Sequence, residues 1–250
     1  MLKKWILLLV IIVVASLILP VGATQYNPPW AHNYGFNYTV YDPDDYDSRP
    51  HATNASNYQS IVGYNAYNLS DSRAYVGYTS IKDDAVVFII AHGVVASPLD
   101  RGGGLAFYNG TLSYIFAEDN GITIPGDKYL LSSMSTELAD LLLAVYASCY
   151  SSRTSPSSGN LVDMTQQKGA DNVIGFSNTV YWYPLGYWSD RFWYRCLYGQ
   201  AGGPQTIRDA AVSAKYDVLA YYGSFGGTNY MFGRYRFPYD YLNPARYGAV

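Results

Sequence analysis

Cysteine and charged residues are both scarce in this chain of 250 residues. Two cysteines, Cys149 and Cys196, are too few for a scaffold held together by several disulfides, so at least one of them needs another explanation. Charged residues make up only 14%, the formal net charge is −3, and no basic run is present. A mildly acidic chain without a basic patch argues against binding to nucleic acid.

Aromatic residues, by contrast, are abundant, and they recur at helical spacing between residues 181 and 198. Such a stretch can bind an extended peptide or a glycan by stacking, but aromatic side chains at this spacing more often belong to a core. We therefore expect this stretch to pack inside the domain.

The first 23 residues have the three-part layout of a secretory signal peptide. Lys3 and Lys4 precede an apolar run over 5–19, and the small residues 21–23 follow. An uncleaved membrane anchor is the alternative, because the run approaches the roughly 20 residues that span a bilayer. Either reading predicts a secreted or cell-surface protein, with possible membrane or cell-envelope association through the N-terminus. Four sequons are then possible glycan acceptors, at Asn37, Asn54, Asn68 and Asn109.

Residues 24–53 are rich in Pro, Asn, Asp and Tyr and predict an extended lead-in, with one short strand over 36–41. No repeat or low-complexity linker divides the remainder, so 54–250 is expected to form one domain. Periodicity predicts helices over 54–68, 72–81, 135–141, 161–168, 187–198 and 206–222. A hairpin is expected from 105–108 and 112–116, after a flexible loop of glycines over 102–104.

Three short apolar runs without polar alternation, over 85–91, 142–147 and 172–177, are typical of strands buried on both faces. Alternation of such strands with helices predicts an α/β fold, a three-layer α/β/α sandwich around a mostly parallel sheet.

Reactive side chains follow two of these strands. His92 comes directly after the first strand, and Cys149 comes just after the second. Adjacent parallel strands bring their carboxyl ends to one edge of a sheet, where α/β proteins place their ligands. A thiol attacks a carbonyl as thiolate, and an imidazole can take its proton and later protonate the leaving group. Backbone N–H groups of Gly93 and Cys149 are the natural donors to the oxyanion.

The motifs AVVFIIAHG, residues 85–93, and LLAVYASCYSS, residues 142–152, resemble the caspase-like cysteine peptidases. This group includes legumains, gingipains, clostripain and metacaspases, and the resemblance covers roughly 54–222. It implies a caspase-like fold and an endopeptidase that hydrolyses peptide bonds through a thioester on Cys149, with His92 as general base and acid. It also implies an acidic residue that pairs with a basic substrate side chain, for which Asp171 and Asp190 are guesses.

Other candidate residues have plainer interpretations. His32 and His51 lie in the polar lead-in and are expected to be exposed, and no cluster has zinc spacing, so neither a metal nor a cofactor is expected. The acidic loop 42–47 favours a solvated turn over a cation site. Cys196 is expected in the core, the alternative being a disulfide with Cys149 that would silence the enzyme.

Several functions remain open from the sequence. An exported endopeptidase acting on a protein or peptide is the leading hypothesis, and a transpeptidase would use the same acyl-enzyme. The alternative from another class is a catalytically silent, glycosylated surface or cell-envelope binding protein on the same fold. An aromatic-rich envelope module unrelated to peptidases would make both motifs coincidental.

Overall fold

The unbroken apolar runs form the middle of a six-stranded sheet in the computed structural model, which describes residues 29–40, 42–97, 100–135, 138–199, 203–224, 231–236 and 240–244. The strand order is β10-β9-β8-β3-β1-β2, and only β10 is antiparallel to its neighbour. The strands are β1 (Trp30–Tyr34), β2 (Asn65–Asn68), β3 (Val86–Ile90), β8 (Leu143–Ala147), β9 (Asn172–Phe176) and β10 (Met231–Tyr235). The three strands expected from the apolar runs are therefore present.

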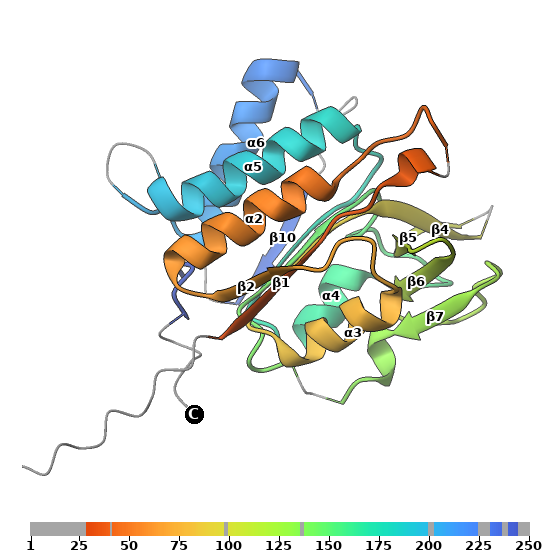
Figure 1. Cartoon of the computed structure of the whole chain (residues 1–250). Coiled ribbons are helices and arrows are strands. Elements are labelled where there is room, and N and C mark those ends of the chain that lie inside the picture. Colours follow the sequence, from red (N-terminus) through yellow and green to blue (C-terminus); the bar gives the residue numbers. More distant parts are fainter. Residues whose placement is uncertain are drawn as a thin grey trace, which may run out of the picture.

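Helices cover both faces of this sheet (Figure 1). One face carries α2 (Arg49–Val62), α5 (Trp182–Tyr198) and α6 (Ile207–Tyr222), and the other carries α3 (Ala74–Asp83) and α4 (Leu161–Gln167). Alternate residues of β3 supply the two cores: Phe88 packs in the α5 layer, and Val87 packs in the opposite one. Because both faces of the sheet are buried, the strand sequences do not alternate between apolar and polar residues. The predicted α/β/α sandwich with a mostly parallel sheet is confirmed.

A second sheet lies beside the first, in the order β4-β5-β6-β7. It consists of β4 (His92–Ser97), β5 (Asp100–Tyr108), β6 (Leu112–Phe116) and β7 (Asp127–Leu130). The expected hairpin is the β5–β6 pair. The glycines predicted to form a flexible loop belong to β5 instead. A Cβ on Gly103 would lie 2.5 Å from the carbonyl carbon of Tyr150, so glycine serves close backbone approach there.

The N-terminal part of the domain differs most from expectation. The strand lies at 30–34 rather than at 36–41, where a 3-10 turn, Tyr38–Val40, is found. β1 pairs with both β2 and β3, and α2 begins at Arg49, so a strand and the start of a helix lie where the sequence predicts an extended lead-in. The sequence pattern does not predict β1, because the strand contains polar side chains whose partners lie far along the chain. Asn33, for example, donates to Gln59 Oε1 at 2.7 Å.

Three helix predictions also need correction. α2 ends at Val62 and is capped by Gly63, which has φ of +111°, so the last residues of the expected 54–68 helix form β2 instead. The described residues of 135–141 are not helical, since Leu138 and Leu141 are buried in a loop. α5 begins at Trp182, ahead of the expected 187. Among the described residues no helix has the length and apolar character to cross a membrane. The predicted signal segment, 1–23, lies outside them.

Candidate active site

The strands β3 and β8 pair in parallel up to Ile90 and Ala147, so the residues after them leave the sheet at the same edge. Ala91 leads to His92, and Ser148 leads to Cys149. Gly93 shows how close the two segments are, because a Cβ there would overlap the Cys149 carbonyl oxygen and lie 2.8 Å from the Cys149 Cβ. The structure therefore brings His92, Gly93 and Cys149 together, and position 93 has no room for a side chain larger than that of glycine.

The imidazole of His92 is held by a carboxylate and two aromatic rings. Its Nε2 lies 2.7 Å from Asp45 Oδ2, which assigns the Nε2 proton to this bond and leaves Nδ1 as the basic nitrogen of the neutral ring. The ring centroid lies 4.3 Å from that of Tyr38 and 4.8 Å from that of Trp182. These contacts fix the plane of the ring at the edge of the sheet.

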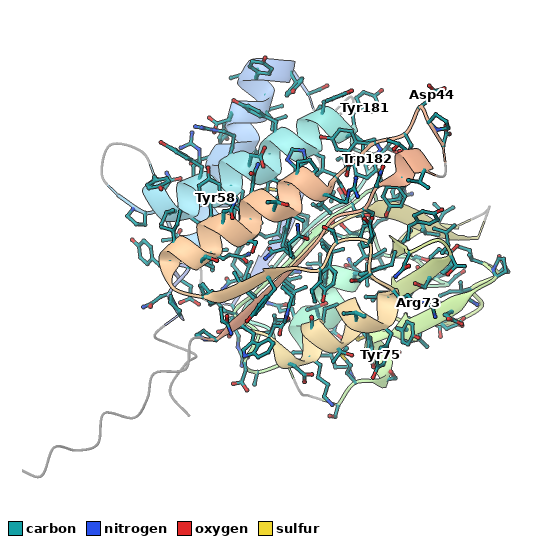
Figure 2. All side chains as sticks on the ribbon, in the orientation of Figure 1. Asp44, Tyr58, Arg73, Tyr75, Tyr181 and Trp182 are labelled. Atoms are coloured by element: carbon teal, nitrogen blue, oxygen red, sulfur yellow. The ribbon has the colours of Figure 1, made fainter. Side chains whose placement is uncertain are left out.

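Asp45 is the site residue that sequence reasoning missed. Its side chain is 17% exposed, and its second oxygen accepts from Trp182 Nε1 at 3.2 Å. Figure 2 places Trp182 at the start of α5, near the loop that carries Asp44. The composition of the acidic loop favours a solvated turn, and nothing in its local pattern separates Asp45 from its neighbours. In the part of the chain that the structure describes, no group of three or more His, Cys, Asp or Glu side chains is arranged to hold a metal.

The thiol of Cys149 is half-buried and bonded to the backbone of Val180. It accepts from the Val180 N–H at 3.3 Å and donates to the Val180 carbonyl at 3.5 Å. Burial raises the pKa of Cys149, and the Val180 contact only partly offsets this. No hydrogen bond joins the thiol to His92 among the described residues. The thiol is therefore neutral at neutral pH and needs a base before it can attack.

The turn after Cys149 is sharp and tightly fixed. Tyr150 has φ of +59°, a left-handed conformation that costs a non-glycine residue about 1 kcal/mol or more. Its N–H donates to the Asn178 carbonyl at 3.2 Å, and its hydroxyl lies 2.6 Å from Thr179 Oγ1. Ser151 Oγ donates to the Tyr146 carbonyl at 2.8 Å. These bonds hold the strained turn and present Cys149 at the edge of the sheet.

Neither acidic residue suggested for the substrate pocket lies free beside Cys149. Asp171 precedes β9 and so lies at the amino edge of the sheet, a strand length or about 16 Å from the thiol edge, which corrects that expectation. Asp190 lies on α5, and its Oδ1 accepts from His51 Nδ1 at 3.0 Å and from Asn54 Nδ2 at 3.1 Å. Its Oδ1 is therefore engaged within the protein, while the side chain stays 34% exposed.

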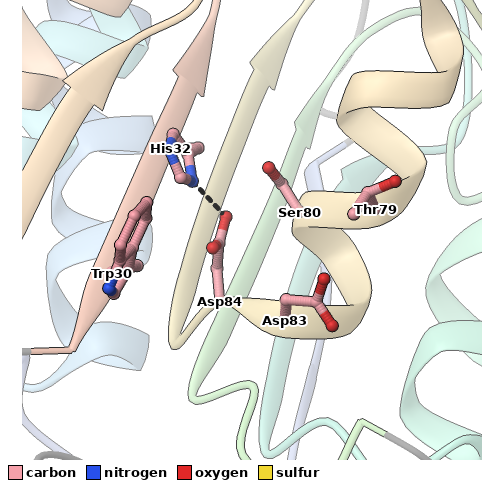
Figure 3. A pocket seen from close by; sticks show the side chains of 6 residues that line it. All are labelled: Trp30, His32, Thr79, Ser80, Asp83 and Asp84. Carbon is pink, nitrogen blue, oxygen red and sulfur yellow. Dashed lines mark hydrogen bonds and ion pairs between the residues drawn. The ribbon is translucent and has the colours of Figure 1, made fainter.

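The expectation that His32 and His51 are exposed is wrong for both. The side chain of His51 is only 13% exposed. His32 is 8% exposed on β1, and its Nδ1 lies 2.7 Å from Asp84 Oδ2 (Figure 3). This pair lines a cavity of about 350 Å³, formed with Trp30, Thr79, Ser80 and Asp83 at the amino edge of the sheet. The charge partner of each histidine is distant in sequence, so composition alone predicted a solvated side chain.

Cys196 is 3% exposed and packs in the core beneath α5, as the sequence predicts. Both cysteines are free thiols. Three of the four sequon asparagines, Asn54, Asn68 and Asn109, are exposed, and Asn37 is half-buried. The aromatic stretch is divided: Trp188, Phe192 and Trp193 are buried, whereas Tyr181, Tyr183 and Tyr198 are exposed. The expectation of core packing thus holds for one side of α5.

Comparison with known proteins supports the fold. No protein-family model matches the sequence, and no curated protein matches it. Among solved structures, the Arg-specific cysteine proteinase gingipain R is similar with a TM-score of 0.54 and 12% sequence identity. The match covers 86% of this chain and 47% of that protein, so this chain spans about half the length of gingipain R. At this identity the match shows the fold alone, which is caspase-like.

Proposed function

We propose that this protein is an exported cysteine peptidase in which Cys149 is the nucleophile, His92 is the general base and acid, and Asp45 orients His92. The observation that carries the proposal is the meeting of the β3 and β8 ends, where Gly93 touches the backbone of Cys149. The fold shared with gingipain R, a cysteine proteinase, supports the same reaction class.

In this reaction Nδ1 of His92 takes the proton of Cys149 as the sulfur attacks the peptide carbonyl. The backbone N–H groups of Gly93 and Cys149 are the proposed donors to the oxyanion. His92 then protonates the departing amine, which leaves a thioester on Cys149. Water, deprotonated by His92, attacks the thioester, and the proton returns to the thiol as the carboxylic acid departs. The two half-reactions use only groups of the chain and water.

Asp45 fits the role of orienting group, because it fixes which nitrogen of His92 carries the proton. Its carboxylate also stabilises the imidazolium that forms when the thiol loses its proton. Since burial keeps Cys149 neutral at rest, reactivity depends on this base rather than on a preformed thiolate.

A catalytically silent surface protein is the second candidate, and one observation favours it. The Cys149 thiol bonds to the Val180 backbone, and its raised pKa is the condition of an unreactive cysteine. Exposed sequons and tyrosines would then serve binding at the cell envelope.

Brief exposure of the folded, reduced protein to iodoacetamide at neutral pH separates the two candidates. We expect labelling at Cys149, measured by mass spectrometry, to be at least about tenfold slower in His92→Ala. Equal and slow labelling in both proteins would favour the silent protein. A screen of a peptide library against wild type and Cys149→Ala then tests hydrolysis, and added amine acceptors test transpeptidation. Cleavage of the first 23 residues on export tests the signal segment.

A further inference from the structure

A third histidine–carboxylate pair, besides His92–Asp45 and His32–Asp84, joins α2 to α5. His51 on α2 bonds to Asp190 on α5 through Nδ1 at 3.0 Å, and its Nε2 lies 2.6 Å from the hydroxyl of Tyr46. Neither His51 nor Asp190 contacts Cys149 or His92 through any described hydrogen bond. The pair instead joins two helices to the loop that holds the Asp45 carboxylate.

Tyr46 connects this pair to Asp45. It follows Asp45 in the chain, and its N–H donates to Asp45 Oδ1 at 2.7 Å. Its ring stacks on Trp182, with centroids 5.2 Å apart and planes 16° apart. Trp182 in turn donates to the same Oδ1. Two donors on Oδ1 leave Oδ2 for His92, so the position of Tyr46 sets the direction of the carboxylate.

A glycine inside α5 makes room for His51. A Cβ on Gly186 would lie 2.7 Å from His51 Cε1 and would overlap Nε2. Glycine inside a helix costs about 1 kcal/mol relative to alanine, and the backbone of Gly186 needs no left-handed conformation. The absence of a side chain at Gly186 thus leaves room for the His51 ring, although glycine makes α5 less stable.

We propose that His51 and Asp190 are positioning residues, which hold Tyr46 so that the Asp45 carboxylate faces His92. They touch no substrate and act only through Asp45. This inference rests on the proposed function for its effect on reactivity. The geometry that it asserts, an Asp45–His92 bond that depends on His51, can be measured without any reaction.

The first measurement is proton NMR of the His92 ring in the full folded chain. The Nε2 proton shared with Asp45 should give a downfield resonance, assigned by its loss in His92→Ala and Asp45→Asn. We expect it to move upfield or broaden in His51→Ala, and also in Tyr46→Phe, which removes only the hydroxyl and keeps the stacked ring. His32→Ala is the matched control, because it breaks a histidine–aspartate pair at the opposite edge. An unchanged resonance in both His51→Ala and Tyr46→Phe would overturn the inference.

The second measurement is the rate of Cys149 alkylation by iodoacetamide. We expect His51→Ala to slow it about tenfold, the scale of a small misplacement of a catalytic group. In an Asp45→Asn background the same change should have no further effect, because His51 acts through Asp45. Equal slowing in both backgrounds would overturn the inference. If His92→Ala leaves the rate unchanged, the proposed function fails, and the NMR result still decides the positioning role.

Discussion

Gly93 and Cys149 are in direct contact through their main chains, although 56 positions separate them in the sequence. The carbonyl carbon of Cys149 would lie 2.7 Å from a Cβ on Gly93, and the carbonyl oxygen still closer. Because the turn after Cys149 is fixed by its own hydrogen bonds, the contact leaves no room for adjustment.

Replacement of this glycine should therefore displace the two strand ends. We expect Gly93→Ala to lower the free energy of unfolding by about 1–3 kcal/mol and to slow alkylation of Cys149. Urea unfolding and mass spectrometry measure the two effects. Gly110→Ala, at a hairpin tip with nothing nearby, is the control: its φ of +70° costs stability but should leave alkylation unchanged. Normal stability and reactivity in Gly93→Ala would contradict the close contact.

Asp45→Asn should slow alkylation of Cys149 by about tenfold or more, because it removes the charge that stabilises the imidazolium and allows the wrong ring tautomer. The control is Asp44→Asn, an exposed neighbour on the same loop, which should react as wild type. Circular dichroism and thermal unfolding check that both variants fold. Equal rates for the two variants would remove Asp45 from the site.

The left-handed residue after Cys149 can be tested by two substitutions. Tyr150→Gly removes the φ penalty but also the hydroxyl bond to Thr179, so we expect a change in stability of less than about 1 kcal/mol. Tyr150→Val places a β-branched residue at φ of +59° and should cost more than about 2 kcal/mol. Chemical denaturation gives both values. A larger loss of stability in Tyr150→Gly than in Tyr150→Val would show that side-chain contacts at this position outweigh backbone strain.

Stability should decline at alkaline pH. Burial raises the pKa of Tyr38 and Tyr146 well above the ordinary value, and that of Tyr46 to about 12. Phenols of the unfolded chain titrate near pH 10, so above about pH 9 the unfolded state loses protons that the folded state keeps. The contribution of these phenols to the free energy of unfolding should be constant below that pH and fall as pH rises beyond it. Urea titrations at several pH values measure this.

Tyr146→Phe provides the matched variant for the alkaline decline. It removes a buried phenol whose hydroxyl lies 2.8 Å from Thr165 Oγ1. The variant should lose stability at neutral pH, because the hydrogen bond between Tyr146 and Thr165 is lost, and should show a shallower decline above pH 9. An identical slope in both proteins would mean that other groups control the alkaline transition.

The central part of the fold follows from sequence because its signals are local. The runs that form β3, β8 and β9 are apolar on both faces, which is typical of strands in a sheet covered on both sides. β1 could not be found this way. His32 and Asn33 are polar residues typical of a loop, and they are buried here because Asp84, Gln59 and the Tyr67 carbonyl, all far along the chain, bond to them.

The candidate site likewise contains residues that the sequence can predict and residues that it cannot. The positions of His92 and Cys149 at strand ends follow from topology, so sequence could bring them together. Asp45 could not be distinguished from Asp44, because its role depends on Trp182, which lies 137 residues further on. Local sequence also does not indicate that Asp171 lies at the far edge of the sheet or that Asp190 has partners on another helix.

The dependence of Asp45 on Trp182 has a consequence for biosynthesis. A growing chain carries the loop of Asp45, then His92, then Cys149, before the start of α5 is made. Until Trp182 and Val180 take their places, the carboxylate and the thiol each lack a partner from that segment. The candidate site would therefore gain its full set of contacts only after the segment that begins α5 has been made.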